Sequence, residues 1–129
     1  MQAHEITSAV QKSARIDTHD HAEQAIRATL TVLGQRILAT EADDLAAQLP
    51  SEYAPCLRHQ GEPDRFDVQE FYRRVAAEEG AGCTPDQARQ HARAVTSALR
   101  EAIGAEYLHI LDELPGDYAD LMHTENVVH

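Results

Sequence analysis

The sequence predicts an all-α protein, a helical bundle built from two tandem repeats of three to four helices with approximate two-fold symmetry. The main observation is that the phrase Leu-Pro-x-x-Tyr occurs twice, at residues 49–53 and 114–118, 65 residues apart. Apolar residues recur at helical spacing before each copy. Aromatic residues make up only 5% of the chain and Trp is absent, so the core must be built from small aliphatic side chains, which favours closely packed helices.

The chain is expected to form a single domain, 1–129, in which repeat one covers 2–58, a linker covers 59–66 and repeat two covers 67–123. Residues 59–65 contain no apolar side chain, which is typical of a connecting segment. Three-helix units of this length cannot bury much surface alone, so we expect the two units to share one core.

Each unit is predicted to open with a short amphipathic helix. Ile6 and Val10 lie four residues apart in the first unit, and Phe71 and Val75 follow 65 residues later. The four-residue spacing places both members of a pair on one helix face.

A long helix follows in each unit. Its apolar stripe comprises Ala22, Ile26, Leu30, Leu33 and Ile37 in the first unit and Ala88, Ala92, Val95, Leu99 and Ile103 in the second. Thr18 and Thr84 lie 66 residues apart, and each can cap such a helix with its hydroxyl. Pro85 at the first helical position and Gln87 three residues after the cap strengthen this prediction.

A third, shorter helix is predicted after a tight corner, with Thr40 as its cap in the first unit. It should end where Pro50 or Pro115 follows a leucine, because proline disfavours a helical conformation in the residue before it. Tyr53 and Tyr118, three residues after these prolines, are predicted to pack their rings inward.

The order of these segments resembles the bacterial family called domain of unknown function 2267. The resemblance lies in a capped long helix, a short helix rich in Asp and Leu, and the sequences QLPSEY and ELPGDY. Residues 41–50 are close to the most typical stretch of that family, and Phe71 followed by Val75 resembles the start of its repeat. Ile6 departs from this pattern. The resemblance covers nearly the whole chain and implies an all-helical fold, but it implies no activity, cofactor or catalytic residue.

The chain has 22 acidic and 11 basic residues, a net charge of −11. This charge repels phosphates and anionic lipids, so neither nucleic acid nor membrane is an expected partner. No stretch approaches the ~18 apolar residues of a membrane span, and the N-terminus lacks a signal-peptide pattern. We therefore expect a cytoplasmic protein in which Cys56 and Cys83 are reduced thiols.

Negative charge is concentrated after Arg100, where no Lys or Arg follows. The candidate partner surface comprises Glu106, Asp112, Glu113, Asp117 and Asp120. Two interpretations are open: a solvated face that aids solubility, or a docking surface for a basic protein partner. The sequence also leaves homodimerisation open.

The segment Asp17-Thr18-His19-Asp20-His21 is the most evident candidate metal site. Its spacing argues against one, because His19 and His21 point in opposite directions at a helix start. His91, at the edge of the second apolar stripe, is expected to be a partly buried, hydrogen-bonded histidine. Cys56-x-x-His59 has no second ligand pair. No metal ligand, cofactor or catalytic residue is therefore predicted.

The sequence contains no G-x-S-x-G turn, P-loop or G-x-G-x-x-G loop, so an enzyme is not predicted. The leading functional hypothesis is a non-enzymatic protein-interaction or adaptor module. The alternative is a small-molecule or metal-binding protein with a site between the two repeats.

Overall fold

The computed structural model describes residues 1–59 and 61–122, and this part of the chain contains helices and no strand. The elements are α1 (Ala3–Ala14), α2 (His19–Arg36), α3 (Ala39–Ala46), α4 (Ala54–Leu57), α5 (Val68–Glu79), α6 (Pro85–Ala102), the 3-10 turn η1 (Ala105–Tyr107), α7 (Leu108–Asp112), the 3-10 turn η2 (Gly116–Tyr118) and α8 (Ala119–Met122). The all-α prediction is confirmed. Residue 60 of the predicted linker and residue 123 at the end of the predicted second unit lie outside the described residues.

The helix bounds follow the register that the sequence predicts. Helices α1 and α5 both have 12 residues and begin 65 residues apart, whereas α2 and α6 both have 18 residues and begin 66 residues apart. An approximate two-fold axis between the halves stays a prediction.

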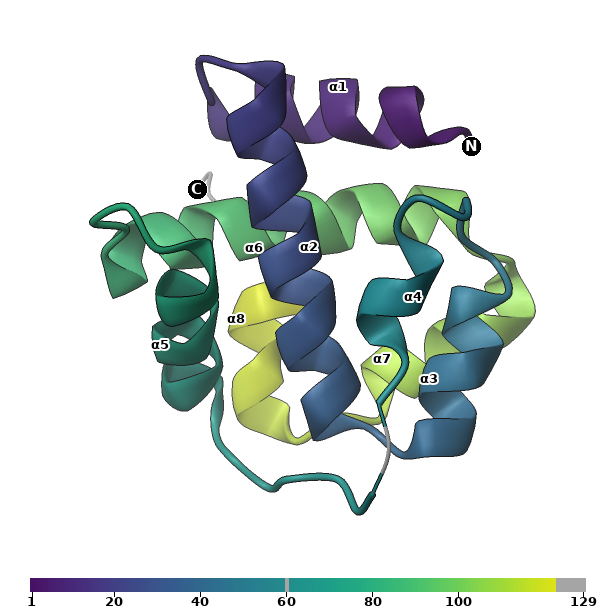
Figure 1. Cartoon of the computed structure of the whole chain (residues 1–129). Helices are drawn as coiled ribbons and strands as arrows, with labels where there is room; N and C mark the ends of the chain where they lie inside the picture. The colour runs from purple at the N-terminus through teal and green to yellow at the C-terminus, as the bar shows by residue number, and fades with distance from the viewer. Residues whose placement is uncertain (60, 123–129) are drawn as a thin grey trace.

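Helices from both halves build one core. Figure 1 shows α2 crossing α6, with α1 across one end of α2. Helix α1 packs against α2 and α6, and α5 also packs against both. The largest fully buried aliphatic side chains come from six elements: Ile6, Ile26, Leu30, Leu33, Leu45, Leu57, Leu111 and Leu121. Neither half could therefore bury its apolar face without the other.

The long-helix caps are confirmed. The hydroxyl of Thr18 accepts a hydrogen bond from the His21 amide, and that of Thr84 accepts one from the Gln87 amide, both at 3.1 Å. The predicted cap at Thr40 is wrong, because α3 already begins at Ala39. Leu38, the residue before α3, has an extended backbone. The Glu41 carboxylate accepts a hydrogen bond from the Leu38 amide, so the helix begins before Thr40.

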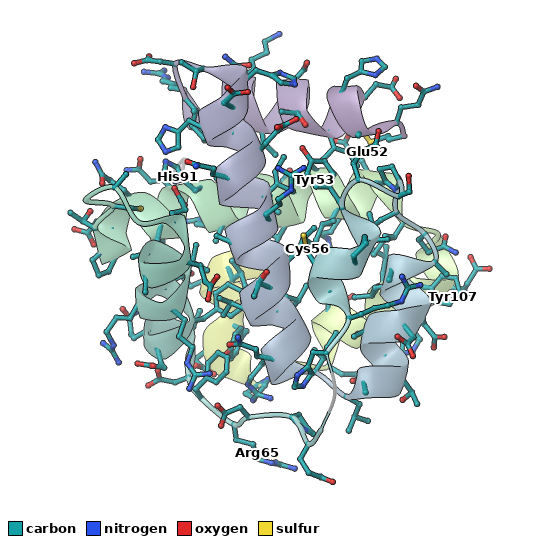
Figure 2. All side chains as sticks on the ribbon, in the orientation of Figure 1. Glu52, Tyr53, Cys56, Arg65, His91 and Tyr107 are labelled. Carbon is teal, nitrogen blue, oxygen red and sulfur yellow. The ribbon has the colours of Figure 1, made fainter. Side chains whose placement is uncertain are left out.

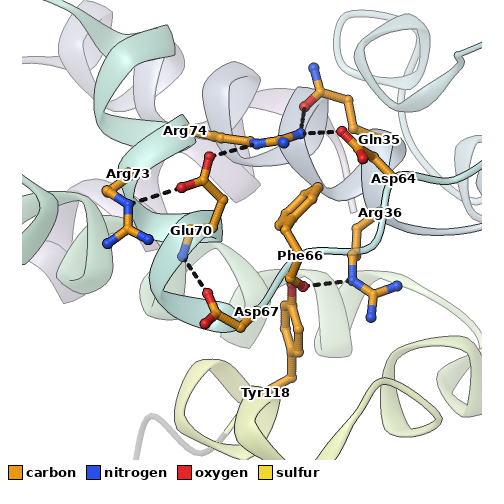
Figure 3. A network of polar contacts seen from close by, with 9 residues as sticks. All are labelled: Gln35, Arg36, Asp64, Phe66, Asp67, Glu70, Arg73, Arg74 and Tyr118. Atoms are coloured by element: carbon orange, nitrogen blue, oxygen red, sulfur yellow. Dashed lines mark hydrogen bonds and ion pairs between the residues drawn. The ribbon is translucent and has the colours of Figure 1, made fainter.

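The segment before α5 is held against the bundle by polar contacts (Figure 3). The Asp64 amide donates to the Gln35 carbonyl at 2.8 Å. The carbonyl of Phe66 accepts hydrogen bonds from the Arg36 side chain at 3.0 Å and from the Tyr118 hydroxyl at 2.7 Å. These contacts fix the start of α5. Because α5 is one continuous helix, they also fix the position of its last residue, Glu79.

Both repeated tyrosines are buried, as predicted, with 1% of their surface exposed. The Tyr118 hydroxyl donates to Phe66, and burial raises the pKa of Tyr118 to about 12. The Tyr53 hydroxyl forms a hydrogen bond with the Thr7 hydroxyl. Helices α3 and α7 end at Ala46 and Asp112, before the phrase begins and not at the leucine before the proline as predicted. The Leu-Pro-x-x-Tyr phrase thus follows the end of a helix and fills the core. Within the described residues, no helix combines the length and apolar character needed to cross a membrane.

Candidate functional site

A cavity of about 460 Å³ lies where the corner between α1 and α2 meets the corner between α5 and α6. Its lining includes Arg15, Asp17, His21, Gln24, Glu79, Cys83, Gln87 and His91. The cavity therefore lies between the two halves of the chain, and each half contributes side chains to it.

Three metal-ligating side chains meet in this cavity. The Nδ1 atom of His91 lies 3.0 Å and 2.8 Å from the two carboxylate oxygens of Glu79. The Nε2 atom of His21 lies 3.4 Å from Glu79 Oε1. One ligating atom from each of the three residues lies within 4.8 Å of the other two. Among the described residues, this is the group of His, Cys, Asp or Glu side chains that is arranged tightly enough to hold an ion.

The carboxylate at the centre of this group is almost completely withdrawn from solvent. The Glu79 side chain is 1% exposed and that of His91 is 10% exposed, whereas His21 is 48% exposed. A buried carboxylate is costly unless positive charge or hydrogen-bond donors surround it. His91 supplies a hydrogen-bond partner, and its ring meets that of His21 edge to face with centroids 5.5 Å apart.

Local sequence explains how each side chain reaches the site. The Thr18 cap begins α2 one residue later, so His21 lies in its first turn. The Thr84 cap and Pro85 begin α6 and place His91 in its second turn. Glu79 is the last residue of α5, and Gly80 then turns the chain with a φ of 68°, a conformation that glycine adopts without a side-chain clash.

Cys83 lies in the same corner and lines the same cavity, half-buried. Burial, followed by the neighbouring Glu79 carboxylate, raises the pKa of its thiol to about 11. The other free thiol, Cys56, lies in α4, outside this cavity. Figure 2 shows Cys56 and His91 on opposite sides of α2.

The structure separates the two histidines of the segment 17–21. His19 turns toward Glu23 of its own helix at 3.8 Å, whereas His21 turns toward Glu79 in the other half. His91 is partly buried and hydrogen-bonded, as expected.

Sequence reasoning missed Glu79, although one signal was present. Phe71, Val75 and Glu79 follow each other at four-residue spacing, so Glu79 continues the apolar face of α5. A carboxylate on an apolar face needs a buried partner. No local pattern identifies that partner, because His21 comes from a distant part of the chain.

The five acidic residues of the candidate partner surface differ in their contacts. Asp112 pairs with Arg100 at 2.9 Å, and Asp117 accepts a hydrogen bond from the Val68 amide at 2.8 Å. Asp120 accepts two hydrogen bonds from Arg89, at 2.7 Å and 2.8 Å. Glu106 and Glu113 are exposed. Three of the five carboxylates therefore serve contacts within the chain, and docking of a basic partner stays a prediction.

Two nitrogen atoms and a carboxylate form a donor set that binds Zn²⁺ and related divalent ions. Two ligands bound to Zn²⁺ at about 2.0–2.1 Å in a tetrahedron lie about 3.4 Å apart. The distance between His21 Nε2 and Glu79 Oε1 already has this value. The His91–Glu79 distance is that of a hydrogen bond, and it needs to widen by roughly half an ångström to admit an ion.

Comparison with known proteins gives a family and no activity. The family described as "Uncharacterized conserved protein (DUF2267)" matches residues 3–121. The search of curated proteins found no match. Since the matched residues include every helix of the bundle up to Leu121 in α8, the chain belongs to the DUF2267 family.

Proposed function

We propose that this protein binds one divalent transition-metal ion of the Zn²⁺ class between its two halves, with His21, Glu79 and His91 as ligands. The observation that carries the proposal is the convergence of three ligating atoms within 4.8 Å from α2, α5 and α6. Two of these side chains are almost fully buried, unlike the exposed acidic groups that gather on protein surfaces without binding an ion.

The chemistry of the three donors favours transition metals over Mg²⁺ or Ca²⁺. Imidazole nitrogen suits Zn²⁺, Cu²⁺, Ni²⁺ and Fe²⁺, whereas Mg²⁺ and Ca²⁺ prefer sets made of oxygen atoms. With His21 and His91 contributing nitrogen, the site has a single carboxylate. An ion there would join α2 of the first half to α5 and α6 of the second half.

The alternative is that Glu79 and His91 only hold α5 against α6. That role explains the 2.8 Å hydrogen bond, but it involves only two of the three converging side chains. Half-exposed, with its imidazole nitrogen 3.4 Å from the carboxylate, His21 is placed as a third ligand at the mouth of the cavity. Its substitution therefore separates the two interpretations.

Equilibrium dialysis against Zn²⁺, followed by elemental analysis, tests the proposal. The unaltered chain should retain one ion, and His21→Ala, Glu79→Gln and His91→Ala should each weaken binding by roughly tenfold or more. His19→Ala and Glu78→Gln are matched controls, since both residues are exposed neighbours outside the cavity. Absence of zinc from the unaltered chain, or undiminished zinc in all three ligand variants, would overturn the proposal.

A role in binding a basic protein remains a second proposal, supported by the exposed Glu106 and Glu113 and the net charge of −11. Reversing Glu106 and Glu113 to lysine leaves the intramolecular pairs of Asp112, Asp117 and Asp120 intact. Capture of a basic partner at low and moderate salt should be lost in this variant, and a partner indifferent to the reversal would contradict the role.

A further inference from the structure

Cys83 lines the cavity that contains the three proposed ligands. It lies on the short corner between α5 and α6, four residues after Glu79 and directly before the Thr84 cap. Its amide donates to the Gly80 carbonyl at 3.0 Å, which closes a turn that brings the cysteine back toward the end of α5.

The thiol and the Glu79 carboxylate line the same cavity. The sulfur atom contacts the Thr84 carbonyl at 3.6 Å. This contact is a weak one, because sulfhydryl groups are poor donors. The thiol therefore has a weak partner to give up and a proposed metal ligand in the same cavity.

We propose that Cys83 is the fourth ligand of the ion, so that His21, Glu79, Cys83 and His91 form a closed tetrahedral site. This inference rests on the proposed function. The thiol loses its proton to solvent as the sulfur–metal bond forms, and the other three donors stay as described. Four protein ligands are typical of structural zinc sites, whereas three ligands and a water are typical of catalytic ones.

The corner itself allows the small movement that this closure needs. Its first three residues, Gly80, Ala81 and Gly82, all have positive φ, and a Cβ placed on either glycine would meet no atom within 4 Å. The corner is thus not wedged against other parts of the bundle. The sulfur atom lies outside the group of ligating atoms within 4.8 Å of one another, so closure of the site requires the Cys83 side chain to turn away from Thr84.

A thiolate ligand also makes the site more selective. Soft sulfur donors favour Zn²⁺, Co²⁺ and Cu⁺ and are poor ligands for Mg²⁺, Ca²⁺ and Mn²⁺. The proposal therefore predicts that a large excess of Mg²⁺ does not displace the bound ion.

Titration of the full chain with Co²⁺ under reducing conditions tests the inference, because a thiolate bound to Co²⁺ gives a near-ultraviolet charge-transfer band. The unaltered chain should develop the band together with visible bands of tetrahedral Co²⁺. Cys83→Ser should lose the charge-transfer band and bind Co²⁺ at least roughly tenfold more weakly. Cys56→Ser, which removes the other half-buried thiol, should keep both signals.

The outcomes separate this inference from the proposed function. Co²⁺ that binds without a charge-transfer band, with the same affinity in Cys83→Ser, would overturn the role of Cys83 and leave the three-ligand site standing. A band that Cys56→Ser abolishes would also overturn it. A chain that takes up no Co²⁺ or Zn²⁺ would overturn the proposed function itself. Far-ultraviolet circular dichroism of the Cys83→Ser chain should match the unaltered spectrum, since Cys83 is only half-buried.

Discussion

The Nδ1 atom of His91 lies 2.8 Å from Oε2 of Glu79, and neither side chain has more than 10% of its surface exposed. This contact joins the last residue of α5 to the second turn of α6 across a tight corner. Because Glu79 is withdrawn from water, its carboxylate depends on His91 as a hydrogen-bond partner. The contact is therefore both a structural pair and the centre of the proposed metal site.

Substitution His91→Ala should lower the free energy of unfolding of the metal-free chain by about 1–3 kcal/mol, because a buried carboxylate loses its closest partner. Urea unfolding in the presence of a chelator measures this change. His4→Ala, at an exposed position in α1, is the control and should change the free energy by less than about 0.5 kcal/mol. Equal values for the two variants would contradict the structural importance of the pair.

Zinc should stabilise the folded chain, because the three ligands converge only when both halves are packed together. At a free Zn²⁺ concentration about 100 times the dissociation constant, the expected gain is about 2.7 kcal/mol. Thermal unfolding with Zn²⁺ and with a chelator measures it. Glu79→Gln should lose most of the gain and Glu78→Gln should keep it, whereas an unfolding temperature independent of Zn²⁺ would argue against the site.

Asp120 should make stability depend on pH in the acid range. Its hydrogen bonds with Arg89 lower the pKa of the carboxyl from 3.8 to about 2. Since the pKa is lower in the folded chain, the carboxylate stabilises the fold above about pH 4, and this contribution is lost as the pH falls toward 2.

The side chain of Asp120 is 36% exposed, so screening by solvent limits the contribution to about 1 kcal/mol. Urea unfolding of the unaltered chain and of Asp120→Asn between pH 2 and 5 measures it. The difference between the two chains should be largest at pH 5 and shrink toward pH 2. A constant difference would show that the carboxylate charge is not responsible.

Gly34 should resist substitution although it lies inside a helix. Alanine favours helices over glycine by about 1 kcal/mol, but a Cβ at Gly34 would lie 2.2 Å from the Leu57 carbonyl oxygen of α4. We expect Gly34→Ala to destabilise the chain by about 1–3 kcal/mol as α2 and α4 move apart. Gly116→Ala, where a Cβ meets no atom within 4 Å, is the control, and equal stability of both variants would contradict this close approach.

Features that depend on local sequence were predictable. The caps at Thr18 and Thr84 are local features, because each hydroxyl accepts a hydrogen bond from the amide three residues later in the chain. The same reasoning was wrong at Thr40, because the extended backbone at Leu38 and the Glu41 carboxylate begin α3 earlier. A local pattern predicts that a helix forms, but not which of two adjacent capping arrangements is adopted.

The candidate site was largely beyond local reasoning. His21 and Glu79 belong to different halves of the chain, and only the packing of α2 against α5 and α6 brings them together. Within the segment 17–21, the spacing of His19 and His21 argues against a shared site, and these two side chains do contact different partners. The intramolecular partners of Asp112, Asp117 and Asp120 were hidden for the same reason.

A crystal structure of the chain grown with Zn²⁺, with anomalous data at the zinc edge, tests the central claim most directly. We predict one strong anomalous peak between His21 Nε2, His91 Nδ1 and the Glu79 carboxylate, with the His91–Glu79 distance wider than its present 2.8 Å. A map with no peak in this cavity, and with His91 still hydrogen-bonded to Glu79, would contradict the account.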